Sequence, residues 1–313
     1  MRPDELVAAA RGGSPRAVAR LISLVEGDSP LLRDVMAELA PHTGHARIVG
    51  ITGSPGVGKS TTTSALVTEL RKRDQRVGVL AVDPSSPFSG GALLGDRIRM
   101  GDHATDAGVF IRSMASRGHL GGLAWTTPQA VRVLDAAGFD TVIIETVGVG
   151  QSEVEIAALA DTTLVLLAPG MGDGIQAAKA GILEIGDLFV VNKADREGAS
   201  NVSRDLRGML SLAERREGAW QPEILKTVSQ DGTGLDEVAA AIDRHHAWLA
   251  ETGELGERRA RRAREEVQAI ALEMMRARWG DVGGAGELET LARAVAAGES
   301  DPYTAADRLI GPQ

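Results

Sequence analysis

The sequence predicts an α/β fold built on a mostly parallel sheet, with helical extensions at both ends of the chain. The first observation is a series of seven short, apolar, β-branched segments, expected as strands at 47–52, 77–82, 108–112, 141–145, 162–168, 187–192 and 223–228. Helical patterns lie between most of them, for example at Thr127–Ala137 and Gly174–Leu183. Strand–helix alternation of this length implies a parallel sheet covered on both faces. The second observation is that polar and glycine-rich motifs follow several strands, where ligands of such sheets bind.

The two ends of the chain differ from this central part. Residues 3 to about 40 carry apolar side chains at helical spacing, and residues 256–298 are rich in Arg, Glu and Ala with few apolar positions. The C-terminal helices either pack on the parent domain or form an arm whose apolar face needs a second subunit, and the scarcity of apolar residues favours the arm. We therefore expect an N-terminal helical extension (1–44), an α/β domain (45–250) and a C-terminal helical dimerisation arm (251–313).

Composition excludes several classes of protein. The 313 residues include no cysteine, which excludes disulfides, thiolate metal sites and cysteine nucleophiles. The net charge of −9 argues against nucleic-acid binding, which usually requires a basic surface. No apolar run approaches the ~18 residues of a membrane span, and the N-terminus lacks the apolar core of a signal peptide. We expect a cytoplasmic protein that binds neither nucleic acid nor membrane.

Residues 53–60 read GSPGVGKS and match G-x-x-x-x-G-K-[ST], the phosphate-binding loop (P-loop) of nucleotide hydrolases. An apolar strand pattern precedes the motif and a helical pattern follows it, as the motif requires. The glycines let several backbone N–H groups point at one spot, and the helix N-terminus adds positive potential there. Lys59 is expected to reach the β- and γ-phosphates and Ser60 to hold Mg²⁺. The residues expected to contact the nucleotide here are Gly53, Ser54, Pro55, Gly56, Val57, Gly58, Lys59, Ser60 and Thr61.

A second motif predicts guanine as the base. Asn192-Lys193-Ala194-Asp195 follows an apolar strand and has the N-K-x-D pattern of GTPases. A carboxylate at Asp195 can accept two hydrogen bonds from guanine, whereas adenine would leave it unpaired. Lys193 would lie along the base and Asn192 would brace the neighbouring loops. Backbone N–H groups near Ser229 and Gln230, after the last strand, could contact the guanine O6, although a plain loop is nearly as good an interpretation of Gln230.

Carboxylates at three positions are candidate ligands of the Mg²⁺ that accompanies Ser60. Asp83 closes the second predicted strand, Asp96 lies in the long loop after it, and Glu145 ends the fourth strand. A helix N-cap is the alternative role for Asp96. Gly148 follows Glu145 closely, and its N–H is expected to sense the γ-phosphate in a loop that orders with the triphosphate.

The group that orients water is not evident. Ras-like GTPases place a glutamine directly after the glycine, whereas Val149 stands here and Gln151 lies two residues further. Gln176 and Lys179 share one helical face after the glycine-rich loop 169–174, and they could supply the missing contacts. A simple strand-to-helix connector is an equal alternative. We therefore predict slow intrinsic GTP hydrolysis that another segment or a partner completes.

With these residues in view, the chain resembles the MeaB family of G-protein chaperones of adenosylcobalamin-dependent methylmalonyl-CoA mutase. The resemblance covers nearly the whole chain and depends on GSPGVGKST at 53–61, DPSSPFSGGALLGDRIRM at 83–100, ETVGVGQSE at 145–153, PGMGDGIQAAKAGILE at 169–184 and NKAD at 192–195. The segment between the P-loop and Glu145 also resembles the branch of GTPases that includes signal-recognition and metallochaperone members.

The resemblance implies a P-loop NTPase fold and binding of GTP or GDP with Mg²⁺. It maps the family's metal site to Ser60, Asp83, Asp96 and Glu145, and a further switch to the loop with Gln176 and Lys179. It implies a homodimer formed through the C-terminal arm. The implied role is to couple GTP binding and hydrolysis to cofactor loading and protection of an acyl-CoA mutase, whose cobalamin would belong to the partner.

Three other functions remain as alternatives. A metallochaperone GTPase of the nickel-insertion type would need Cys or clustered His, and the chain has no Cys. A kinase or transport ATPase would need adenine selectivity, against which Asp195 argues. A module that binds GTP without hydrolysing it is kept open by Val149.

Overall fold

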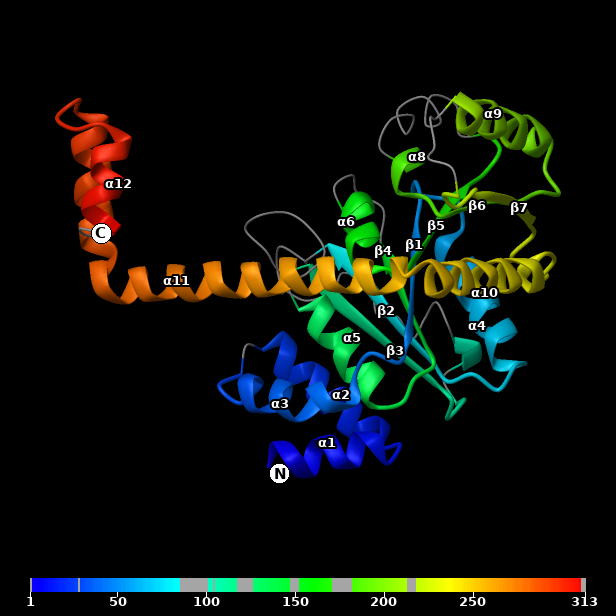
Figure 1. Cartoon of the computed structure of the whole chain (residues 1–313), viewed down its shortest axis with the longest axis horizontal. Helices are drawn as coiled ribbons and strands as arrows, with labels where there is room; N and C mark the ends of the chain where they lie inside the picture. The colour runs from blue at the N-terminus through cyan, green and yellow to red at the C-terminus, as the bar shows by residue number, and fades with distance from the viewer. Residues whose placement is uncertain are drawn as a thin grey trace. The chain divides into compact units, whose positions relative to one another are not determined.

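The computed structural model describes residues 2–27, 29–84, 101–103, 105–116, 126–146, 152–170, 182–212 and 218–310. All seven predicted strands are present and form one sheet (Figure 1). They are β1 (Arg47–Thr52), β2 (Val77–Pro84), β3 (Val109–Ser116), β4 (Thr141–Thr146), β5 (Thr162–Leu167), β6 (Leu188–Asn192) and β7 (Glu223–Thr227). The order is β3-β2-β4-β1-β5-β6-β7, and each neighbouring pair is parallel. The predicted α/β fold with a parallel sheet is therefore confirmed.

The sheet is buried on both faces, which explains why its strands are continuous apolar runs. All six residues of β4 are buried, and alternate side chains enter different cores: Ile143 packs with α4 (Lys59–Arg71) and α10 (Leu235–Thr252), whereas Val142 and Ile144 pack with α5 (Thr127–Ala136) and α6 (Ser152–Leu159). On this second face, α9 (Ala199–Leu212) covers β5 and β6. The short helix α8 (Ile182–Ile185) precedes β6. The predicted helix Gly174–Leu183 lies almost wholly outside the described residues.

Three helices precede the sheet: α1 (Pro3–Arg11), α2 (Pro15–Glu26) and α3 (Leu32–Leu39), followed by the 3₁₀ turn η1 (Ala40–His42). Helix α2 begins after Ser14, whose hydroxyl accepts a hydrogen bond from the Ala17 N–H at 3.3 Å. Helices α2 and α3 pack on α5, beside which they lie in Figure 1. Arg112 of β3 pairs with Glu26 at the end of α2. The N-terminal helices thus belong to the same core as the sheet.

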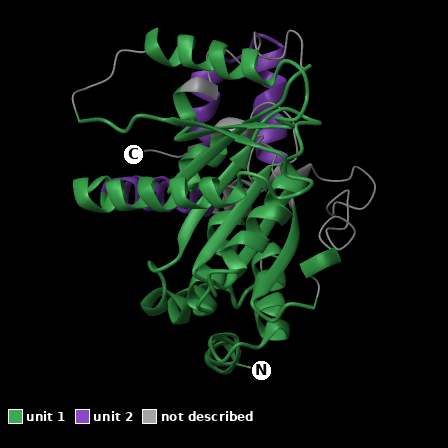
Figure 2. Ribbon diagram, turned by 90° about the vertical axis from the view of Figure 1, so that its right-hand side faces the viewer, with its two compact units in different colours: residues 1–256 green, residues 257–313 purple. Residues whose placement is uncertain are grey.

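The chain divides into two compact units, residues 1–256 and 257–313, which Figure 2 colours separately. The 3₁₀ turn η3 (Gly101–His103) comes between β2 and β3, and the long helix α11 (Glu254–Ala296) and α12 (Pro302–Ile310) follow α10. Apolar side chains of α11 are exposed at Val267, Leu272, Met275 and Leu288. No helix within the described ranges is both long and apolar enough to cross a membrane. The domain limits expected from the sequence stay a prediction.

Candidate nucleotide-binding site

The P-loop occupies the centre of the sheet edge, because β1 is the middle strand and β4 and β5 flank it. Residues 53–58 link β1 to α4, the helix predicted from the sequence. Gly53 has a φ of 139°, and a Cβ there would lie 2.3 Å from the Leu166 carbonyl oxygen of β5. Gly58 has a φ of 99°, and its Cβ would lie 2.5 Å from the Asn192 side-chain nitrogen. Both positions therefore require glycine, for backbone conformation and for space.

Lys59 folds back over the loop that precedes it. Its ammonium is buried and donates hydrogen bonds to the carbonyl oxygens of Gly53 and Ser54, the latter at 3.2 Å. Lys59 also begins α4, so the positive end of the helix dipole lies at the same loop. The combination of a buried cation and a helix N-terminus favours a multiply charged anion at this place.

Two predicted metal ligands meet beside the P-loop. The Ser60 hydroxyl donates to Glu145 Oε1 at 2.6 Å, and Glu145 is 2% exposed. They meet because Glu145 of β4 is in register with Ile51 of β1, just before the loop. The oxygen ligands that Mg²⁺ prefers are the ones present here, so this pair fits a magnesium site.

The other predicted phosphate and metal residues are only partly described. The backbone of Asp83 belongs to β2 and pairs with Ala115 of β3. On its other side, β2 pairs with β4, the strand that carries Glu145. The carboxylate of Asp83 is not among the side chains that the structure describes. Asp96, Gly148, Gln176 and Lys179 lie outside the described residues.

Asn192 connects the P-loop to the two strand ends beside it. Its side chain is 3% exposed, and its amide nitrogen donates to the Val57 carbonyl oxygen at 2.8 Å. Its oxygen accepts from the Thr227 hydroxyl at 3.2 Å and from both the N–H and hydroxyl of Ser229, at 3.1 and 2.8 Å. One side chain at the end of β6 thus links the P-loop to the loop after β7.

The remaining residues of the base motif lie on the solvent side of Asn192. Lys193 has a φ of 56°, and its ammonium donates to the Gly56 carbonyl oxygen at 2.6 Å. The Ala194 N–H donates to the Thr227 carbonyl oxygen at 3.0 Å, so that the motif is held against the end of β7. Asp195 is exposed at this sheet edge.

The loop after β7 has only one of its expected donors available. The N–H of Val228 donates to the Thr233 carbonyl oxygen, and that of Ser229 donates to Asn192. Gln230 is exposed, and its N–H makes no hydrogen bond within the part of the chain that the structure describes. Ser229 therefore braces Asn192, and the N–H of Gln230 is left to meet a ligand.

Thr62 is a site residue that sequence reasoning did not identify. Its hydroxyl donates to the Gly58 carbonyl oxygen at 3.0 Å and lies 2.8 Å from the Ser229 hydroxyl. This fully buried side chain extends the Asn192 contacts into α4. The signal in the sequence is a run of threonines at the start of a helix whose later buried positions, Leu66, Val67 and Leu70, are apolar.

Comparison with known proteins identifies the group to which the chain belongs. Residues 18–281 match the family model described as methylmalonyl Co-A mutase-associated GTPase MeaB. A protein of Pyrococcus abyssi is 48% identical over 309 residues, covering 98% of this chain and 95% of its own. GTPase ArgK of Escherichia coli is 38% identical over 252 residues, covering 78% of this chain and 76% of ArgK.

Two further relatives bear on function and fold. The mitochondrial methylmalonic aciduria type A homolog of Mus musculus is 38% identical over 214 residues, which are 67% of this chain and 52% of that protein. A crystal structure described as LAO/AO transport system kinase has a TM-score of 0.74 and 28% identity, with 98% of this chain and 96% of that one covered. Three findings agree: the lysine of the P-loop folds over the loop, the N-K-x-D motif is hydrogen-bonded to the loop, and the family model matches most of the chain. The chain therefore belongs to the MeaB family of P-loop GTPases.

Proposed function

We propose that this GTPase is a G-protein chaperone of an adenosylcobalamin-dependent acyl-CoA mutase, methylmalonyl-CoA mutase or a close relative. In this role, GTP binding and hydrolysis are coupled to loading and protection of the mutase cofactor. The observation that carries the proposal is the family match over residues 18–281, which extends from the N-terminal helices through the P-loop into α11. The name of the mouse relative, methylmalonic aciduria type A homolog, points to the same area of metabolism.

The phosphate end of the site binds the triphosphate through main-chain N–H groups of the P-loop, with Lys59 on the β- and γ-phosphates. Ser60 and Glu145 hold Mg²⁺ together with Asp83 and Asp96, a role that the 2.6 Å contact between Ser60 and Glu145 supports. Mg²⁺ neutralises charge on the β- and γ-phosphates when it is bound. The N–H of Gly148 contacts the γ-phosphate, so that the loop senses which nucleotide is present.

The base end selects guanine. The carboxylate of Asp195 accepts from the N1–H and 2-amino group, and the N–H of Gln230 donates to O6. Lys193 covers the base while its ammonium holds the P-loop at Gly56. Discrimination against adenine is large because a carboxylate placed for two donors would meet none.

Hydrolysis transfers the γ-phosphoryl group to water: the new P–O bond forms as the bond to the β-phosphate oxygen breaks, and GDP leaves. Val149 has no polar atom to orient this water, so intrinsic turnover is slow. Gln176 and Lys179 supply contacts to the phosphates when the partner binds, which makes the reaction dependent on the partner. A second observation favours a homodimer, because α11 exposes Val267, Leu272, Met275 and Leu288.

A nucleotide-dependent pull-down tests the proposal. The tagged chain is incubated with native cell extract in the presence of GDP or a non-hydrolysable GTP analogue, and a Lys59→Ala variant serves as the matched control. We expect a cobalamin-dependent mutase in the eluate, retained differently in the two nucleotide states and raising the rate of GTP hydrolysis when added back. Recovery of a hydrogenase or urease precursor in its place would support the nickel-insertion alternative and contradict the proposal.

A further inference from the structure

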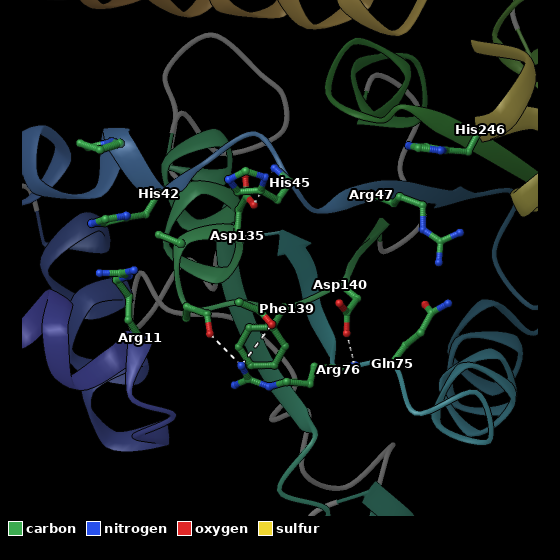
Figure 3. A pocket seen from close by; sticks show the side chains of 14 residues that line it. Arg11, His42, His45, Arg47, Gln75, Arg76, Asp135, Phe139, Asp140 and His246 are labelled. Carbon is green, nitrogen blue, oxygen red and sulfur yellow. Dashed lines mark hydrogen bonds between the residues drawn. The ribbon is translucent and has the colours of Figure 1, made fainter. Parts of the chain in front are cut away.

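A pocket of about 790 Å³ lies at the opposite end of β1 from the P-loop. Its walls include Arg47, Arg76 and Asp140, which lie at or just before the starts of β1, β2 and β4. Arg11 of α1 and His42 of η1 face them from the N-terminal segment, as Figure 3 shows. The volume lies in the range of small-molecule sites. At ~3.3 Å per residue, β1 separates this pocket from the P-loop by about 20 Å.

The carboxylates of the pocket are already engaged by the backbone. Asp135 is buried and accepts hydrogen bonds from the N–H groups of His45 and Ala46, at 3.1 and 2.9 Å. Asp140 accepts one from the N–H of Arg76 at 2.7 Å. These contacts offset the negative charge that would otherwise repel an anion or attract a cation.

Arg76 covers a second source of negative potential, the C-terminal end of α5. Its guanidinium donates to the carbonyl oxygens of Ala137 and Gly138, at 2.9 and 3.1 Å. The same group lies 4.7 Å from the centre of the Phe139 ring, which holds its plane in place. Figure 3 shows Arg76 and Phe139 between the two sides of the pocket.

Side chains of the pocket that can donate hydrogen bonds remain available to a ligand. Across residues 2–310 as far as the structure describes them, the side chains of Arg11, His42 and His45 make no hydrogen bond or ion pair. Of the three arginines that line the pocket, Arg47 pairs with Asp243 and Arg76 donates to backbone carbonyl oxygens, which leaves the guanidinium of Arg11 for a ligand. A guanidinium fork and imidazole N–H groups match the oxygens of a phosphate group.

We propose that this pocket binds a small phosphate ester, with Arg11 and His42 as its principal contacts. An ester suits the site better than the bare ion, because the pocket is far larger than one phosphate group and includes the aliphatic and aromatic surface around Phe139. The ligand would bridge the N-terminal segment and the base of the sheet, so binding stabilises the docking of α1. This inference is independent of the client enzyme and of the nucleotide site.

Calorimetric titration of the full chain, saturated with GDP so that the P-loop is filled, tests the proposal. The probes are inorganic phosphate and glucose 6-phosphate at matched ionic strength. We expect both to bind, the ester more tightly, with affinity falling at least about tenfold in Arg11→Gln, the effect of one lost charge-assisted contact. Arg16→Gln is the matched control, since Arg16 is an exposed arginine of α2 outside the pocket.

His42→Gln provides a second variant, and thermal unfolding without ligand checks that each variant folds. Loss of binding in both pocket variants, with Arg16→Gln unchanged, supports the site. Equal affinity for the two probes would support the phosphate contacts of Arg11 and His42 but contradict the preference for an ester. Absence of binding to wild type, or wild-type affinity in both Arg11→Gln and His42→Gln, would overturn the proposal.

Discussion

Replacement of Asn192 by alanine tests the central structural feature of the nucleotide site. The side chain makes one donated and three accepted hydrogen bonds while 3% exposed. Its removal leaves the Val57 carbonyl oxygen and the Ser229 N–H without these partners in a buried place. The two hydroxyl partners, on Thr227 and Ser229, can rotate to other acceptors and lose less.

The magnitude follows from the two backbone groups. Each buried group left unpaired costs about 1–3 kcal/mol, and a water molecule that enters the space of the lost side chain offsets part of it. We expect Asn192→Ala to lower the free energy of unfolding by about 2–4 kcal/mol, a large part of the ~5–15 kcal/mol typical of a protein. Because the tether to Val57 also shapes the P-loop, GDP affinity should fall by about 10–100-fold, which corresponds to about 1.4–2.8 kcal/mol.

Urea unfolding and fluorescent-GDP titration measure the two effects. Asn201→Ala is the matched control, because Asn201 is exposed on α9 and should change the free energy of unfolding by less than about 0.5 kcal/mol. Asn192→Asp keeps the acceptor oxygen but replaces the donor facing Val57 by an oxygen, so we expect a loss of affinity similar to that of alanine. If Asn192→Ala unfolds like the Asn201→Ala control and binds GDP as wild type does, the tether has no energetic role and the reasoning fails.

Three further predictions address other parts of the fold. Gly58→Ala should weaken GDP binding at least about tenfold, because the new Cβ meets the Asn192 side-chain nitrogen at 2.5 Å and φ is 99°; wild-type affinity by titration would contradict it. Asp195→Asn should shift preference from GTP toward xanthosine triphosphate, because the amide donates where the carboxylate accepted; competition binding measures the shift, and an unchanged preference would place the base elsewhere. Asp106→Asn should lower the free energy of unfolding by about 1–2 kcal/mol at pH 7, because the hydrogen bond from Arg71, at 2.8 Å, lowers the pKa of Asp106. Because its pKa is lower in the folded state, Asp106 stabilises the fold above the unfolded-state pKa, and this stabilisation is lost as the pH falls. The difference in free energy of unfolding between wild type and Asp106→Asn, measured in urea, should therefore vanish below about pH 4. A difference that stays constant with pH would exclude this linkage.

Most of the fold could be predicted from the sequence because the signals are local. Strands buried on both faces must be nearly continuous apolar runs, and six of the seven appear within two residues of their predicted limits, whereas β3 continues four residues beyond its predicted end. The P-loop glycines could also be predicted, since left-handed backbone and close approach exclude other residues at Gly53 and Gly58. Asn192 was predicted as a brace, because its motif follows a strand that ends beside the P-loop.

Other features depend on residues that are distant in the sequence. Ser229 was expected to meet the base, yet its N–H is taken by Asn192 of a different strand. Thr62 joins the same network from α4, and the run of threonines around it does not by itself reveal its contact with Ser229. No pattern in the sequence connects His42, His45 and His246, and the structure brings them to one pocket.

The sequence by itself determined the parallel sheet, the phosphate-binding loop and the preference for guanine, because each depends on a short run of residues whose chemistry is local. Only the tertiary structure decided which donors are already used and which charges are already neutralised. Hydrogen bonds between strand ends, such as those of Asn192, and the convergence of Arg11 with Arg76 at the base of the sheet depend on strand order and helix docking. Those long-range arrangements arise from packing of the whole core, and no short segment of the chain encodes them.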